Sequence, residues 1–190
     1  GKKFGKSEGN ALWLDKDKTS SYELYQYLIN LEDSMIITYL KMLTFLSKEE
    51  IDELEKKNRE NPHLREAHKA LAREIITDLH GHREYEKALK LSNILFTEEF
   101  KDLSSSEIEE IFSGNNIIDI TSNNLLDLLI EIGASKSKRE AREFIMGNAI
   151  KVNGEKVNDL EYMIQDSDFI DNKYIIIKRG KKNYYVGKRS

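Results

Sequence analysis

The spacing of apolar residues changes along this chain, and that change limits the possible folds more than any other feature. Between residues 20 and 96, apolar residues recur at intervals of three and four, which is typical of amphipathic helices. After residue 148, short apolar runs are typical of strands, and Asn153-Gly154 between two of them is a strong hairpin-turn signal. We therefore predict a multi-domain chain, with an all-α helical domain followed by a small α+β domain.

Polar residues and one proline mark the expected helix ends. Asn61 before Pro62 predicts a helix start, because proline at the first helical position loses no hydrogen bond, and Gly81 is the expected end. The helix starting at Asp33 or Ser34 is apolar on most faces, so we expect it to be largely buried. Other helix starts are expected at residues 19–21, Ser47 and Ser104.

Four segments follow from these patterns. Residues 97–122 are polar and poor in long apolar patterns, so we expect a linker with one short helix there. Beyond it, residues 125–132 and 138–146 are typical of short helices, and strands are expected at 149–152, 174–178 and 183–186. The expected segments are a loop with a short docked segment at 1–19, a helical domain at 20–96, the linker at 97–122 and the α+β domain at 123–190.

Net charge is unevenly distributed. The chain carries a net charge of -4, but residues 1–120 hold 17 Lys+Arg and 24 Asp+Glu (net -7), whereas residues 121–190 hold 13 and 10 (net +3). This split predicts a basic C-terminal module, so the acidic total does not exclude an RNA-binding protein.

Several classes of protein and site are disfavoured by what the sequence lacks. With no cysteine there are no disulfides, thiolate zinc sites or cysteine nucleophiles, and the four histidines alone do not indicate a metal site. No apolar run approaches the roughly 20 residues of a membrane-spanning helix, and the N-terminus lacks a signal-peptide pattern. We expect a soluble cytoplasmic protein without a metal site. Acidic pairs such as Glu98-Glu99 are expected to be helix-start charges rather than catalytic carboxylates.

The first functional motif is Lys3-Phe4-Gly5-Lys6-Ser7. Its end matches a phosphate-binding loop, but Gly1 lies four residues before Gly5 where that motif requires five, which argues against a P-loop NTPase. The segment through Asp15 resembles the K-M-S-K-S signature loop of class I aminoacyl-tRNA synthetases, in the K-F-G-K-[ST] form of the bacterial tyrosyl family. The resemblance implies that Lys6 contacts ATP phosphates, that Lys3 assists it and that Ser7 donates a hydrogen bond. Two ammonium groups there would neutralise charge on the departing pyrophosphate.

The second motif covers residues 125–145 and 150–157. It resembles the small RNA-binding domain named after the fourth protein of the small ribosomal subunit, with the pattern S-[KR]-x-[ED]-A-[KR]-x-h-I followed by V-N-G-x-x-V. Helical spacing places Lys138, Arg139 and Arg142 on nearly one outer face, where they could lie along a phosphate backbone.

The segment 178–189 contains six cations and no acid, with Tyr184 and Tyr185 adjacent. It is either a frayed basic tail or part of an RNA surface, where phosphate attraction and stacking act together. The two tyrosines could also simply pack in the last strand. The expected RNA-binding residues are Lys136, Ser137, Lys138, Arg139, Arg142, Lys151, Lys178, Arg179, Lys181 and Lys182.

Taken in order, the loop, the helical domain and the α+β module resemble the C-terminal part of bacterial tyrosyl-tRNA synthetases. The resemblance implies that a Rossmann-type catalytic domain with an H-I-G-H motif precedes Gly1, so we expect a fragment that is inactive alone, monomeric and without a cofactor. The parent would be a homodimer that uses ATP with magnesium to activate tyrosine and attach it to tRNA(Tyr). The helical domain would lie near the anticodon stem, and the α+β module against the long variable arm. The alternative is a free-standing RNA-binding or ribosome-associated module.

Overall fold

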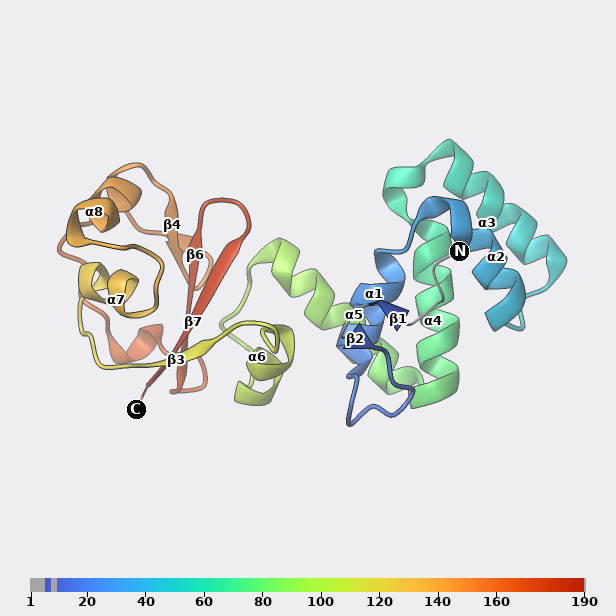
Figure 1. Cartoon of the computed structure of the whole chain (residues 1–190), viewed down its shortest axis with the longest axis horizontal. Helices are drawn as coiled ribbons and strands as arrows, with labels where there is room; N and C mark the ends of the chain where they lie inside the picture. The colour runs from blue at the N-terminus through green and yellow to red at the C-terminus, as the bar shows by residue number, and fades with distance from the viewer. Residues whose placement is uncertain (1–5, 8–9, 190) are drawn as a thin grey trace. The chain divides into compact units, whose positions relative to one another are not determined.

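A computed structural model describes residues 6–7 and 10–189, with only the backbone described at residues 6, 7, 10 and 11. The chain divides into two units, Gly1–Asn93 and Ile94–Ser190. The predicted order, a helical part followed by an α+β part, is confirmed (Figure 1). No helix within the described ranges is long and apolar enough to cross a membrane.

The first unit is built around one central helix. Helix α4 contacts α1, α2 and α3, and its Leu71 and Ile76 are fully buried, as are Leu28 of α1 and Leu40 of α2. The predicted starts of α1 and α3 are confirmed by complete capping boxes at Ser20 and Ser47. The elements are β1 (Lys6–Ser7), β2 (Asn10–Ala11), α1 (Ser21–Ile29), α2 (Asp33–Leu43), α3 (Lys48–Glu60), a 3-10 turn η1 (Pro62–Leu64), α4 (Glu66–His80) and α5 (His82–Thr97), which continues past residue 93.

The start of α4 differs from the prediction. Pro62 begins only the 3-10 turn, Asn61 makes no side-chain capping bond, and the long helix starts after Arg65, whose φ is 52°. The Arg65 guanidinium donates hydrogen bonds to the carbonyl oxygens of Ile29 (2.6 Å) and Leu31 (2.8 Å). We infer that these contacts outside the helix, which a local signal cannot report, hold Arg65 in its left-handed conformation. Gly81 ends α4, as predicted.

Helix α2 is less buried than its composition predicted. Within it only Ile36 and Leu40 are buried, whereas Met35, Met42 and Leu43 are 39%, 71% and 44% exposed. The helix packs on α3 and α4 through a single face. The expectation of a largely buried helix is therefore wrong.

The second unit is a five-stranded sheet in the order β3-β7-β6-β4-β5, in which only the β3–β7 pair is parallel. Ile175 and Ile177 of β6 join one core with α7 and α8. The rings of Tyr184 of β7, Phe100 and Phe112 form a second cluster. Phe112 directly follows α6. The elements are α6 (Ser105–Ile111), β3 (Ile117–Ile120), α7 (Leu125–Glu131), α8 (Lys138–Met146), β4 (Ile150–Val152), β5 (Glu155–Lys156), a 3-10 turn η2 (Asp166–Asp168), β6 (Tyr174–Arg179) and β7 (Asn183–Arg189).

Residues 97–122 differ from the expected linker. The predicted short helix is present as α6, but residues 117–120 form β3, which pairs in parallel with β7. Phe100 and Phe112, from the same segment, are buried. This segment is therefore part of the second unit.

That boundary also changes the charge distribution. Residues 94–190 carry 14 Lys+Arg and 17 Asp+Glu, a net charge of -3, and residues 1–93 carry 16 and 17, a net charge of -1. Seven acids in residues 94–120 belong to the unit that we expected to be basic. The prediction of a net basic module is wrong, so any RNA surface must come from a local arrangement of cations.

The C-terminal residues are not a frayed tail. Strand β7 (Asn183–Arg189) lies between β3 and β6 and pairs with both. Lys181 and Lys182 occupy the exposed turn that connects β6 to β7. The alternative of a mobile basic extension is therefore excluded for these residues.

Candidate nucleic-acid interface

Helix α8 presents the predicted cations to solvent. The Ser137 side chain accepts a hydrogen bond from the Glu140 backbone N–H at 3.2 Å and caps the helix. Ala141 and Ile145 are fully buried in the core shared with α7. The predicted cations are exposed: Lys136 just before the helix, and Lys138, Arg139 and Arg142 within it, with the exposed Glu143 on the same helix.

Two of these cations already have acidic partners. Lys138 Nζ lies 2.6 Å from Asp127 Oδ1, and the hydrogen bond from Lys138 lowers the pKa of Asp127. Arg139 Nε lies 3.1 Å from Glu143 Oε1 on the next turn of α8. Exposed pairs of this kind contribute little to stability, so a phosphate can compete with the carboxylates at small cost.

The turn between β6 and β7 adds a second group of cations beside α8. Arg179 donates a hydrogen bond to the carbonyl oxygen of Ala134, in the connection between α7 and α8. Its Cζ atom lies 5.1 Å from the ring centroid of Phe144 on α8 and 5.6 Å from that of Tyr185 on β7. Through these contacts the end of β6 lies against α8, and the exposed Lys181 and Lys182 follow directly. The α8–turn surface consists of Lys136, Lys138, Arg139, Arg142, Arg179, Lys181 and Lys182, and among the described residues only Lys138 and Arg139 of this set form side-chain ion pairs. The Lys136 backbone N–H donates a hydrogen bond to Glu140 Oε2, but its ammonium group has no acidic partner in the described part of the chain.

Lys151 and Lys178 have different surroundings. Both ammonium groups contact Glu98, at 2.5 Å from Lys151 and 2.6 Å from Lys178, and the Glu98 side chain is only 12% exposed. Burial acts to raise the pKa of Glu98, but hydrogen bonds from the two lysines outweigh it and hold that pKa below its usual value. Lys178 also lies over the Tyr184 ring, on the side of the sheet that carries Phe100. The structure therefore does not bring these two lysines together with the α8–turn surface.

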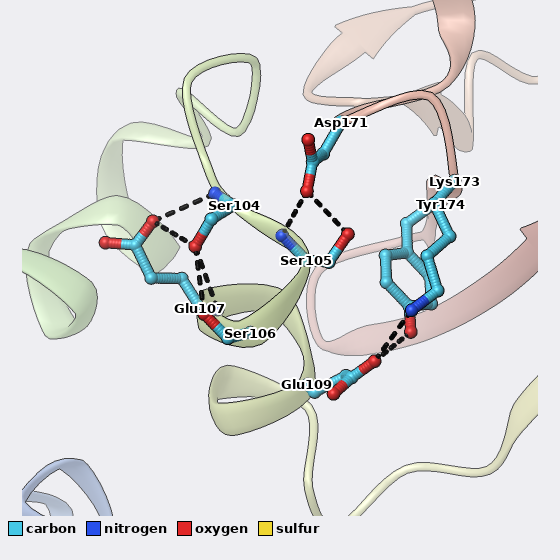
Figure 2. A network of polar contacts seen from close by, with 8 residues as sticks. All are labelled: Ser104, Ser105, Ser106, Glu107, Glu109, Asp171, Lys173 and Tyr174. Carbon is cyan, nitrogen blue, oxygen red and sulfur yellow. Dashed lines mark hydrogen bonds and ion pairs between the residues drawn. The ribbon is translucent and has the colours of Figure 1, made fainter.

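Polar contacts through two further acids, Glu109 of α6 and Asp171 just before β6, join α6 to the start of β6 (Figure 2). The backbone N–H and hydroxyl of Ser105 both donate to Asp171 Oδ2, at 2.8 and 2.6 Å. Glu109 accepts a hydrogen bond from the Tyr174 hydroxyl and pairs with Lys173 at 3.2 Å. Glu109 thus neutralises Lys173 away from α8, as Glu98 neutralises Lys151 and Lys178.

Glu98 was missed by sequence reasoning. It follows the end of α5 with a φ of 61°, so the expectation that it is a helix-start charge is wrong. Its main-chain oxygen also approaches Gly154, where an added Cβ would lie 2.3 Å away. No local pattern signals this role, because both lysine partners are more than 50 residues away in sequence.

Part of the signature loop, including Lys3, lies outside the described residues. Lys6 and Ser7 form β1, paired with β2 in the register Lys6↔Ala11 and Ser7↔Asn10. The following segment is held by His80, whose Nε2 lies 2.8 Å from the Leu14 carbonyl oxygen.

The other ring nitrogen of His80, Nδ1, lies 2.8 Å from the Ser21 hydroxyl. His80 thus connects the end of α4 to the residues that follow the loop. Within the described ranges, no group of three acidic, histidine or cysteine side chains could hold a metal ion.

Comparisons with known proteins agree at both ends of the chain. The family described as "tRNA synthetases class I (W and Y)" matches residues 1–97, and the family "Tyrosine--tRNA ligase SYY-like C-terminal domain" matches residues 107–186. The tyrosine--tRNA ligase of Staphylococcus carnosus is 47% identical over 190 residues, covering 99% of this chain and 45% of the relative. That of Macrococcus caseolyticus is 48% identical over 186 residues, covering 98% and 45%.

The chain thus spans a little under half the length of these curated relatives. A solution structure of a tyrosyl-tRNA synthetase C-terminal domain aligns with 48% of this chain and 95% of its own, with 33% identity and a TM-score of 0.40.

Proposed function

The chain belongs to the class I tyrosyl-tRNA synthetases, and on this premise we propose that it is the tRNA-binding C-terminal portion of an enzyme that activates tyrosine with ATP and attaches it to tRNA(Tyr). The observation that carries the proposal is the α8–turn surface, which gathers seven cations in a unit of net charge -3, five of them without a side-chain ion pair among the described residues. In such a unit, attraction of phosphates depends on where the cations are placed rather than on the total.

The resemblance to the family supports the rest of the proposal. The first unit binds near the anticodon stem, and the second binds the long variable arm. The full-length enzyme is a cytoplasmic homodimer, whereas the 190-residue chain alone is monomeric and uses no cofactor. A free-standing RNA-binding module would not explain the family match over residues 1–97, whereas the C-terminal portion of a synthetase does.

In the full-length enzyme, the signature loop would act on ATP. We propose that Lys6, assisted by Lys3, contacts the ATP phosphates and stabilises the negative charge that develops on pyrophosphate as tyrosine attacks, while Ser7 donates a hydrogen bond. Magnesium would accompany the phosphates, and no cluster of described side chains in this chain fits a metal ion. Because the chain spans only 45% of the length of the Staphylococcus carnosus relative, we expect the 190-residue chain alone to catalyse no tyrosine-dependent exchange of pyrophosphate into ATP, and measurable exchange would contradict the proposal.

Binding of the chain to a tRNA(Tyr) transcript at several salt concentrations tests the RNA surface. Each phosphate contact contributes about 0.9 to the slope of log K against log salt on duplex regions. Replacing Lys138, Arg139 and Arg142 together by alanine should weaken binding and flatten that slope. Unchanged affinity and slope would refute the assignment of α8.

A matched control separates position from total charge. Lys101, Lys173 and Arg189 also belong to the second unit but lie outside the α8–turn surface, and each pairs with an acid, at distances of 2.7, 3.2 and 2.7 Å, as Lys138 and Arg139 do. Their triple alanine variant loses the same charge, but it should keep most of the salt slope. If both triple variants lose the slope equally, the attraction is a property of net charge and not of the α8–turn surface.

A further inference from the structure

The side chain of Arg179 is fixed in a way that no other cation of the α8–turn surface is. It is only partly exposed, it donates to the Ala134 carbonyl oxygen, and its guanidinium faces the rings of Phe144 and Tyr185. The two rings come from different elements, α8 and β7. The arginine therefore lies where helix, turn and sheet meet.

Its neighbour Lys178 shows the contrast. Lys178 also lies over a tyrosine ring, that of Tyr184, but its charge is taken up by Glu98 at 2.6 Å. Arg179 has two rings and a carbonyl oxygen around it and no carboxylate partner among the described residues. Its positive charge is held in place without being neutralised.

A guanidinium is suited to this arrangement. It carries five N–H donors in a rigid plane, and the bond to Ala134 uses one of them. An aromatic ring attracts the cation through its face and takes no N–H donor from it. The remaining donors stay available for a phosphate, which a planar guanidinium can bind with two parallel hydrogen bonds.

We propose that Phe144 and Tyr185 are positioning residues for tRNA binding, which hold the Arg179 guanidinium so that it contacts a tRNA phosphate together with the cations of α8 and the β6–β7 turn. This inference rests on the proposed function. An arginine held in its bound geometry loses little side-chain freedom when the phosphate arrives, so the rings increase affinity without touching RNA. They act through Arg179, and their effect disappears when the arginine is absent.

Affinity and salt slope for a tRNA(Tyr) transcript, measured with the 190-residue chain, test this. Arg179→Ala should weaken binding roughly tenfold and lower the slope by about 0.7 to 0.9, the contribution of one phosphate contact. Tyr185→Leu and Phe144→Leu should each weaken binding roughly threefold, a partial loss expected if Arg179 is present but less ordered. Tyr185→Phe keeps the ring and should bind as the wild type does.

The double variant gives the decisive comparison. In a chain that already carries Arg179→Ala, Tyr185→Leu should cause no further loss of affinity, because the ring has no arginine left to position. Tyr184→Leu is the matched control, since it removes a tyrosine ring from the other cluster and should lower the melting temperature without changing the salt slope. An equal loss from Tyr185→Leu with and without Arg179 would overturn the inference.

Spectroscopy keeps the test informative if a leucine variant is unstable. The Nε–H and Cδ–H proton resonances of Arg179 should shift between the wild type and Tyr185→Leu and remain close to wild type in Tyr185→Phe, because nearby rings displace such resonances. Unshifted resonances in Tyr185→Leu would overturn the inference. Failure of the wild-type chain to bind tRNA(Tyr) would instead overturn the proposed function, so the two failures are distinguishable.

Discussion

Replacing Glu98 by glutamine should destabilise the second unit strongly for a single isosteric change. The carboxylate is 12% exposed and lies 2.5 and 2.6 Å from two ammonium groups that are 29% and 14% exposed. Removing one partner of a fully buried ion pair costs about 3 to 5 kcal/mol, and an exposed pair contributes about 0 to 1 kcal/mol. Partial burial with two short contacts lies between these limits, so we expect a loss of about 2 to 3 kcal/mol.

Thermal and urea unfolding measure this loss. For a unit of about this size, each kcal/mol lowers Tm by roughly 4 to 8 °C, so Glu98→Gln should lower it by roughly 8 to 24 °C. Hydrogen exchange, read peptide by peptide, should assign the loss to residues 94–190. Glu99→Gln is the matched control, because Glu99 is exposed and should change stability by less than about 0.5 kcal/mol.

The pH dependence supplies an independent check. The pKa of Glu98 is lowered from 4.5, so its contribution is present above pH 4.5 and is lost as pH falls through the lowered value. The pKa of Lys178 is raised from 10.5, chiefly by its hydrogen bond to Glu98, so its contribution is lost as pH rises through the raised value. Glu98→Gln should flatten both limbs of the stability profile. If Glu98→Gln unfolds like Glu99→Gln and keeps both limbs, then the contacts of Glu98 with Lys151 and Lys178 do not stabilise the second unit.

Two further predictions concern single sites. Gly154→Ala should destabilise the second unit by more than Gly133→Ala in urea unfolding. Both positions have positive φ, but only at Gly154 would the added Cβ meet a backbone atom, the Glu98 oxygen at 2.3 Å. Equal losses of stability from the two variants would contradict this. Burial, and then the charge of Arg65, lower the pKa of His68 from 6.5, so the first unit should lose stability as pH falls below 6.5. His68→Gln should remove that part of the pH dependence in thermal unfolding, and an unchanged profile would show that His68 is not its source.

Local signals predicted those elements whose determinants lie close together in sequence. Helix α8 begins at the Ser137 cap, and the β4–β5 turn forms at Asn153-Gly154, where both residues have positive φ, 48° and 91°. Glycine and asparagine reach that conformation at low cost, so the pair alone specifies a tight hairpin. The cations on α8 were predictable for the same reason, because helical spacing fixes which side chains share a face.

Distant contacts decided what could not be predicted. The start of α4 depends on carbonyl groups that Arg65 reaches more than 30 residues away, and the fate of Lys151 and Lys178 depends on Glu98. The prediction of a net basic module was wrong for the same reason. Seven acids of the second unit lie in residues 94–120, most of which were expected to be a linker. The roles given to the signature-loop lysines come from resemblance, and their spacing alone does not specify them.

The parallel pairing of β3 with β7 imposes a delay during synthesis. Ile117 pairs with Val186, so β3 is synthesised 69 residues before its partner, which corresponds to roughly 3 to 14 s at about 5 to 20 residues per second. Among the described strands β3 pairs with β7 alone, and the edge of β6 that pairs with β7 is also unpaired until β7 is made. Until β7 is made, the nascent chain carries isoleucine-rich segments with open hydrogen-bonding edges, which are the sites where a nascent sheet is most exposed to wrong pairing and most in need of a chaperone.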